Sequence, residues 1–295
     1  MKSKFVSIVC VAGTAVVLTP ALVGAHAETV PPGDEPAICQ PWVEATIIFG
    51  SENPDPVAAE AALVAVEADV PDEIAGDVPV VLDAGRKALT GDFSGFESPE
   101  FESSVSAVDS FVFDNCAFDS KIDVQAVDWA FGDIPLEITA GLAAFRLNNL
   151  GDEVHELALV RKLEGTTESF AELAPLIAAE DPSVMDKVEF VGGAFSPGAD
   201  LPGMAFAELE PGEYAAICFV PIGSLQGAEM DMGEGEGSAG SMPPSSDSPA
   251  ATAAGADTTT AGTTGASVDS APAGDAGYDA HFAHGMLQEF TVIEG

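Results

Sequence analysis

Histidine and cysteine are scarce in this chain, with four of each, and half of these eight residues stand where they could bind a metal. His155 follows an Asn-Asn-Leu-Gly turn, and Cys218 lies in a short apolar run that ends a predicted strand. His281, His284 and Met286 share the segment HFAHGM near the end of the chain. A mononuclear copper site that passes electrons needs a thiolate, two imidazoles and usually a weak axial thioether, because sulfur suits Cu(I) and imidazole suits both oxidation states. The chain has all of these donors.

Of the four cysteines, Cys10 lies in the N-terminal apolar run and is expected to be removed with a signal peptide, and the other three divide into a pair and a remainder. Cys39 and Cys116 bracket a region with helical patterns, so we expect them to form a disulfide with each other in an oxidising compartment. Cys218 is then left over. By arithmetic alone it could be a free thiol, an intermolecular bridge or a metal ligand.

The N-terminus has the features of a secretory signal peptide. Lys2 and Lys4 precede an apolar run over residues 5–23, and the small-residue triplet Ala25-His26-Ala27 follows it. Gly13 and Pro20 interrupt the run, which makes a permanent membrane anchor the weaker alternative. We therefore expect cleavage near Ala27, removal of residues 1–27, and a secreted or extracytoplasmic protein.

The charge balance restricts the possible partners. Asp and Glu number 49 against 9 Lys and Arg, and the formal net charge is −40. Nucleic acid and anionic membranes are unfavourable partners because like charges repel. Such a surface fits either a salty habitat or a partner with a basic patch.

Residues 28–120 are predicted to form a small helical module closed by the Cys39–Cys116 disulfide. Apolar side chains recur at helical spacing in segments 56–69, 72–90 and 99–113. In the first segment, Pro56 stands at the start, and the predicted stripe consists of Val57, Ala61, Val64 and Ala68.

From residue 121 the pattern changes to short runs with strand character, separated by Gly and Pro. The predicted strands are 121–131, 142–149, 154–163, 188–195, 213–220 and 286–293. Such a series is typical of an all-β sandwich, here with a helical insert at 167–180. Residues 227–277 contain almost no bulky apolar side chain, so we expect a disordered acidic insertion.

Residues 121–295 resemble the cupredoxins, the family that includes plastocyanins and halocyanins. His281 and Met286 have the spacing of that family's second histidine and axial methionine. The segments 148–157 (NNLGDEVHEL) and 211–218 (PGEYAAIC) are similar to those that carry the first histidine and the cysteine.

The resemblance implies a fold, a ligand set and an activity. The overall fold class would be α+β, a small helical module followed by a Greek-key cupredoxin-like sandwich. One type 1 copper ion would be held by His155, Cys218, His281 and Met286. The protein would be an electron carrier and not an enzyme, an exposed His281 or His284 would pass the electron, and the partner would be a redox protein.

Positions 219–280 separate Cys218 from His281, a longer interval than plastocyanins have. This interval is roughly sixteen times longer, which is about four doublings of the loop length. Each doubling adds roughly 0.6 kcal/mol, so the extra loop closure costs about 2.4 kcal/mol. His284 is an additional imidazole that the family does not require. Two other functions stay open: a copper carrier or store that exchanges the ion, and a metal-free extracellular binding module with a cupredoxin-like fold.

Overall fold

The computed structural model describes residues 35–51, 54–224 and 279–295. All of these residues belong to one compact unit. The signal peptide predicted at 1–27 and the insertion predicted at 227–277 lie outside the described residues and stay predictions.

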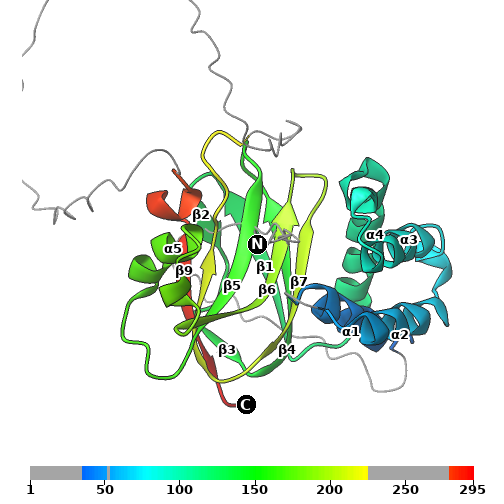
Figure 1. Cartoon of the computed structure of the whole chain (residues 1–295), viewed down its shortest axis with the longest axis horizontal. Helices are drawn as coiled ribbons and strands as arrows, with labels where there is room; N and C mark the ends of the chain where they lie inside the picture. Colours follow the sequence, from blue (N-terminus) through cyan, green and yellow to red (C-terminus); the bar gives the residue numbers. More distant parts are fainter. Residues whose placement is uncertain (1–34, 52–53, 225–278) are drawn as a thin grey trace, which may run out of the picture. The chain divides into compact units, whose positions relative to one another are not determined.

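Helices come first along the chain and strands follow (Figure 1). The helical region contains α1 (Cys39–Phe49), α2 (Pro56–Glu67), α3 (Val78–Leu89) and α4 (Pro99–Asn115), with short 3-10 turns η1 (Asp72–Ile74) and η2 (Ser94–Glu97). The strands are β1 (Ser120–Val127), β2 (Ala130–Gly132), β3 (Glu137–Thr139), β4 (Gly141–Asn149), β5 (His155–Lys162), β6 (Val188–Ser196), β7 (Gly203–Leu209), β8 (Gly212–Ile217) and β9 (Leu287–Ile293). Between strands lie α5 (Phe170–Ala178), η3 (Pro182–Val184) and η4 (His281–His284).

The strands form two sheets. One has the order β2-β1-β4-β7 and the other β3-β9-β8-β5-β6. The β1–β4 and β3–β9 pairs are parallel and the other pairs are antiparallel. The predicted fold class is confirmed: the chain has a helical N-terminal region followed by a β-sandwich of two sheets, α+β overall.

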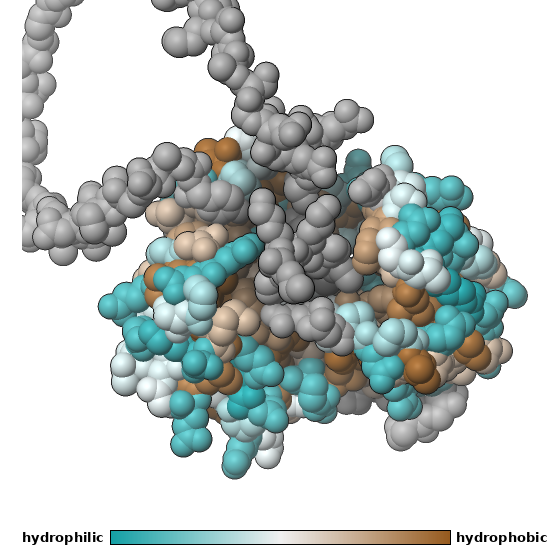
Figure 2. All heavy atoms as spheres, in the orientation of Figure 1, coloured by the Kyte–Doolittle hydropathy of each residue, from teal (hydrophilic) through white to brown (hydrophobic). Residues whose placement is uncertain are grey.

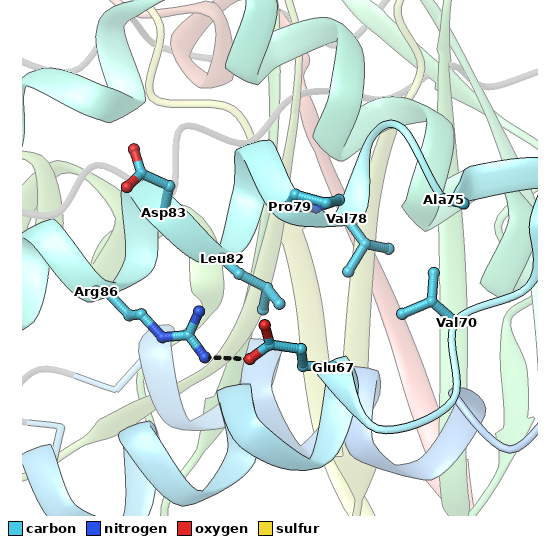
Figure 3. Close-up of a pocket in the computed structure, with 8 residues that line it drawn as sticks. All are labelled: Glu67, Val70, Ala75, Val78, Pro79, Leu82, Asp83 and Arg86. Atoms are coloured by element: carbon cyan, nitrogen blue, oxygen red, sulfur yellow. Dashed lines mark hydrogen bonds and ion pairs between the residues drawn. The ribbon is translucent and has the colours of Figure 1, made fainter.

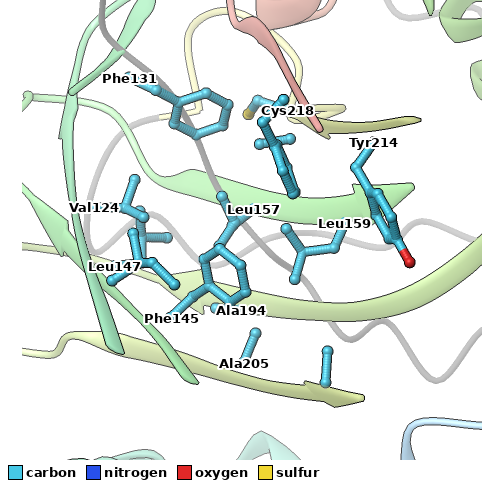
Figure 4. Packing of buried hydrophobic residues seen from close by; sticks show 14 of the residues in the cluster. Val124, Phe131, Phe145, Leu147, Leu157, Leu159, Ala194, Ala205, Tyr214 and Cys218 are labelled. Carbon is cyan, nitrogen blue, oxygen red and sulfur yellow. The ribbon is translucent and has the colours of Figure 1, made fainter. Parts of the chain in front are cut away.

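The sandwich core lies between the two sheets. In β1 the buried residues Ile122, Val124 and Ala126 alternate with residues that are exposed or half-buried, as a strand with one covered face requires. Figure 4 shows residues of this core, among them Phe145, Leu157 and Tyr214. Cys218 and Met286 belong to the same cluster, which places the predicted copper ligands in well-packed surroundings.

The helical region agrees only partly with the sequence analysis. In α2, Asp55 caps the first turn by accepting hydrogen bonds from the Val57 and Ala58 amides. The predicted stripe was wrong, because Val57 and Val64 are 79% and 53% exposed. The residues that α2 buries are Ala59, Ala62, Leu63 and Val66. Its apolar residues surround the helix almost completely, so their spacing could not identify the buried face.

Segment 72–90 is not one helix but the turn η1 followed by α3. Pro79 explains the break, because proline is tolerated in the first turn of a helix and disrupts an interior turn. Among the α-helices and strands of the described residues, three were missed altogether: α1, which contains Pro41, and the strands β3 and β7.

The helices pack on the sheet that contains β4 and β7. Trp42 of α1 and Val112 of α4 share one hydrophobic cluster with Ala144 of β4 and Phe206 of β7. The division into two domains near residue 120 therefore stays a prediction, since both regions contribute to this cluster. The predicted Cys39–Cys116 disulfide is present, with Cα atoms 5.6 Å apart, and Cys218 is free and buried.

A carboxyl group is buried in the helical region. The Trp42 indole nitrogen donates a hydrogen bond to Asp109 Oδ1 over 2.7 Å, and both side chains are buried. Burial raises the pKa of Asp109 to about 7, and the hydrogen bond from Trp42 opposes this rise. The native state therefore holds the Asp109 proton more tightly than the unfolded chain does. As the pH rises from about 4 to about 7, the unfolded chain ionises Asp109 first, and the protein loses stability.

We expect Asp109→Asn to stabilise the protein at pH 8. The ionised carboxylate costs on the order of 4 kcal/mol there, since each pKa unit is worth about 1.4 kcal/mol. The amide oxygen can still accept from Trp42, and its unpaired NH₂ group costs about 2 kcal/mol, so the net gain is about 2 kcal/mol. Urea unfolding at pH 5 and pH 8 measures this change, with the exposed Glu102→Gln of the same helix as control. Wild type should lose stability between pH 5 and pH 8 because Asp109 ionises, and Asp109→Asn should not share this loss. If both proteins lose the same free energy of unfolding over this range, Asp109 is not a buried neutral carboxyl.

Candidate metal centre

Three of the four predicted ligands come together in the structure. Ligand atoms of His155, Cys218 and His281 all lie within 4.8 Å of one another, and all three residues are buried. His155 is the first residue of β5, Cys218 follows β8, and His281 begins η4. Figure 4 shows Cys218 and Phe131 together at one end of the core.

Backbone pairing holds the segments of Cys218 and His281 together. The Phe282 amide donates to the Cys218 carbonyl over 3.0 Å, and the His281 amide donates to the Val220 carbonyl over 3.0 Å. One step further from the site, Pro221 and Ala280 form an antiparallel bridge. We call the paired segments 218–222 and 279–282 the stem. The stem fixes the two ligand segments directly, so their separation does not depend on the length of chain between residues 222 and 279.

His281 is enclosed by its neighbours. Its Nδ1 lies 3.4 Å from Cys218 Sγ, and its Nε2 lies 3.0 Å from Glu153 Oε2. The ring of Trp129 contacts His281 edge-on at a centroid distance of 5.2 Å. His281 is only 1% exposed, so the expectation that it would be an exposed electron port was wrong. The carboxylate and the indole cover the edge of the ring that would otherwise reach solvent.

His155 is fully buried, and its nitrogens lack hydrogen bonds. Neither Nδ1 nor Nε2 has a hydrogen-bond partner among the described residues, although Asp128 Oδ1 lies 3.4 Å from Nε2. Burial lowers the pKa of His155 to about 4; nearby His281 acts in the same direction, and Asp128 opposes it. The imidazole is thus neutral at pH 7. Buried nitrogens without a partner are costly, and a metal ion would give this ring the partner that it lacks.

The Cys218 thiol holds its proton. Burial raises the pKa of Cys218 well above its usual value, and the charges of Glu156 and Glu153 act in the same direction. A hydrogen bond from the Val220 amide opposes this rise. Metals bind the thiolate, so an ion entering this site must displace the proton. One soft sulfur and two imidazoles fit copper, and the donor set therefore agrees with the ion implied by the sequence.

Met286 is buried beside these residues. Its carbonyl accepts from the Cys218 amide over 3.1 Å, and its amide donates to the His281 carbonyl over 3.2 Å. The backbone of Met286 thus joins the segments of Cys218 and His281. Its role as the axial ligand stays a prediction.

His284 lies outside the group. Its Nε2 lies 2.7 Å from Asp279 Oδ1, and its side chain is exposed. The structure therefore groups His281, and not His284, with Cys218 and His155.

Three residues around the site were missed by the sequence analysis: Asp128, Trp129 and Glu153. Trp129 has a positive φ of 68°, which is uncommon for a bulky side chain. No residue spacing predicts their contacts. Asp128 and Trp129 come from the β1–β2 turn, and Glu153, although only two positions before His155, reaches His281 only through the fold.

A pocket in the helical region offers less chemistry. It has a volume of about 180 Å³ and lies between the end of α2 and α3 (Figure 3). Its cationic side chain, Arg86, is paired with Glu67 over 2.6 Å and with Glu60 over 3.4 Å. These ion pairs occupy the guanidinium.

Within the part of the chain that is described, no helix has the length and apolar character needed to cross a membrane.

No family model matches the chain. A search of curated proteins also finds no match.

Solved structures of blue copper proteins are similar to it. Auracyanin A, a "blue" copper protein from the green thermophilic photosynthetic bacterium Chloroflexus aurantiacus, is 19% identical; the match covers 34% of this chain and 87% of that one, with a TM-score of 0.26. Dithionite-reduced auracyanin from Roseiflexus castenholzii is 14% identical over 36% of this chain and 87% of its own, with a TM-score of 0.27. Auracyanin B is 18% identical over 35% and 80%, with a TM-score of 0.25. The resemblance to blue copper cupredoxins is thus found among solved structures over about a third of the chain, and the functional argument rests on this chain's own residues.

Proposed function

We propose that this chain is a copper-binding electron carrier with one type 1 site formed by His155, Cys218, His281 and Met286. The observation that carries the proposal is the buried group of two imidazoles and one thiol, whose ligand atoms lie within 4.8 Å of one another. His155 strengthens it, because both of its buried nitrogens lack a hydrogen-bond partner within the described residues. When bound, the copper ion would take up and release one electron.

The surroundings favour a retained ion over an exchanged one. Cys218, His155 and Met286 have no measurable exposure, and His281 is 1% exposed. Two carboxylates and the stem hold the imidazole-bearing segments in place. A copper store or copper carrier must exchange its ion, which requires a ligand that opens readily to solvent. Because the four residues are buried, we favour the electron carrier over the copper store or carrier.

Export and a basic redox partner belong to the same proposal. The Cys39–Cys116 disulfide supports an oxidising, extracytoplasmic location. The net charge of −40 supports a partner with a basic patch, since opposite charges speed association. In the view of Figure 2, hydrophilic residues line the lower rim of the sandwich, with hydrophobic residues scattered between them. No chemical transformation of a substrate is proposed.

A spectroscopic titration tests this function. One equivalent of Cu(II) added to the full mature chain should produce a strong absorption band in the orange-red region and saturate at one ion. Because the Cys218 thiol is protonated in the free protein, binding at pH 7 should also release about one proton, measurable with a pH indicator in weak buffer. A protein that stays colourless and contains no copper by metal analysis would leave the metal-free binding module as the function.

A further inference from the structure

Glu153 connects three segments of the candidate metal centre. The residue lies in the loop between β4 and β5, two positions before His155. Its Oε2 accepts a hydrogen bond from the Gly223 amide over 2.6 Å and lies 3.0 Å from His281 Nε2. The carboxylate thus links the loop before His155, the chain after Cys218 and the ring of His281. Its side chain is only 13% exposed, so solvent screens these contacts weakly.

The backbone of Glu153 is also held. Its amide donates to Asp128 Oδ1 over 3.4 Å, and its carbonyl accepts from Asn149 Nδ2 over 2.8 Å. The next residue, Val154, donates its amide hydrogen to the Ser224 carbonyl over 2.8 Å. The carboxylate is therefore presented by a fixed loop, and its contact with His281 does not depend on a freely moving side chain.

This contact determines which nitrogen of His281 is free. A carboxylate accepts a hydrogen bond from an imidazole N–H, so the proton of the neutral ring lies on Nε2. Nδ1 then has its lone pair available, and it is Nδ1 that lies 3.4 Å from Cys218 Sγ. If the ring turned over, both contacts would be lost.

We propose that Glu153 is a positioning residue that holds His281 with Nδ1 toward Cys218 and, through its negative charge, favours oxidised over reduced copper. The redox part of this proposal rests on the proposed function. A carboxylate bonded to a metal-bound histidine strengthens that ligand, and a nearby negative charge stabilises Cu(II) more than Cu(I) because the attraction scales with ionic charge. Asp128, 3.4 Å from His155 Nε2, adds a charge of the same sign.

The reduction potential of the copper-loaded full chain tests the redox part. Glu153→Gln keeps an oxygen that can accept from Gly223 but removes the charge. We expect its Cu(II)/Cu(I) equilibrium to move about tenfold toward Cu(I), which for a one-electron couple is a potential about 59 mV higher in voltammetry, where the electrode supplies the electron. Asp152→Asn is the matched control, because it removes the same charge from the neighbouring, exposed residue. A Glu153→Gln potential equal to that of Asp152→Asn would overturn the redox part and leave the blue copper function standing.

The copper-free protein gives an independent readout of positioning. In wild type and in Asp152→Asn, the His281 Nε2 proton should give an NMR signal that is protected from exchange with solvent. Glu153→Ala, which removes the acceptor, should lose this signal at the same pH. Its persistence would overturn the positioning role whether or not copper binds. Loss of the signal in a chain that never turns blue would support positioning and refute the proposed function. If Glu153→Gln does not fold, Glu153→Ala, which also removes the charge, should give the same direction of change in the potential.

Discussion

Replacing Cys218 with alanine is expected to abolish the orange-red absorption band and to weaken Cu(II) binding by more than about 100-fold. The band requires a copper–thiolate bond, and Cys218 supplies the sulfur that lies 3.4 Å from His281 Nδ1. Changes beside a metal ligand typically cost 10- to 100-fold in affinity, and loss of the ligand itself should cost more. The measurement is a visible titration combined with a competition assay for Cu(II).

The fold should survive this substitution. Cys218 is fully buried, and cysteine behaves there as a small hydrophobic residue, so alanine leaves a cavity smaller than a methionine or leucine truncation would. His284→Ala is the matched histidine control, because His284 is exposed and bonded to Asp279, and it should leave the colour largely unchanged. If His284→Ala removed the colour and His281→Ala did not, the ligand assignment would be wrong.

Removal of the disulfide should cause the largest loss of stability. Cys39 and Cys116 are 77 positions apart, and in the chain-entropy model a crosslink over such a loop stabilises by about 4.5 kcal/mol. Both sulfurs lie in the hydrophobic cluster that the helices share with β4 and β7. The double variant Cys39→Ala with Cys116→Ala should therefore lower the urea midpoint, followed by far-UV circular dichroism.

The double replacement avoids leaving one reactive thiol that could form a wrong bridge. Cys218→Ala is the control, because it removes a cysteine without opening the loop. A free-energy loss below about 1 kcal/mol in the double variant would show that the crosslink does not restrict the unfolded chain as the entropy model assumes.

Sequence patterns predicted the sandwich well because its strands alternate or form short apolar runs between turn residues. They were less accurate in the helices, where alanine and valine surround α2 and conceal its buried face. The residue types of the candidate ligands and their order could also be read along the chain, since donor chemistry depends on residue type, and three of the four are brought together by the fold. The carboxylate contacts could not be foreseen in this way: Asp128 approaches His155, and Glu153 approaches His281, only because loops from different strands meet at one end of the sandwich. The burial of His281 has the same origin, since Trp129 and Glu153 both approach it from elsewhere in the sequence.

The stem also bears on how this protein can change during evolution. The Pro221–Ala280 bridge holds the two segments of the stem side by side. The hydrogen bond from the Ile222 amide to the Asp279 carbonyl continues this pairing one step further from Cys218 and His281. Insertions and deletions between residues 222 and 279 therefore leave the ligand segments under the same local constraint. We therefore expect that this stretch can be exchanged for a short turn, or for a folded domain whose termini lie close together, without moving Cys218 and His281 apart.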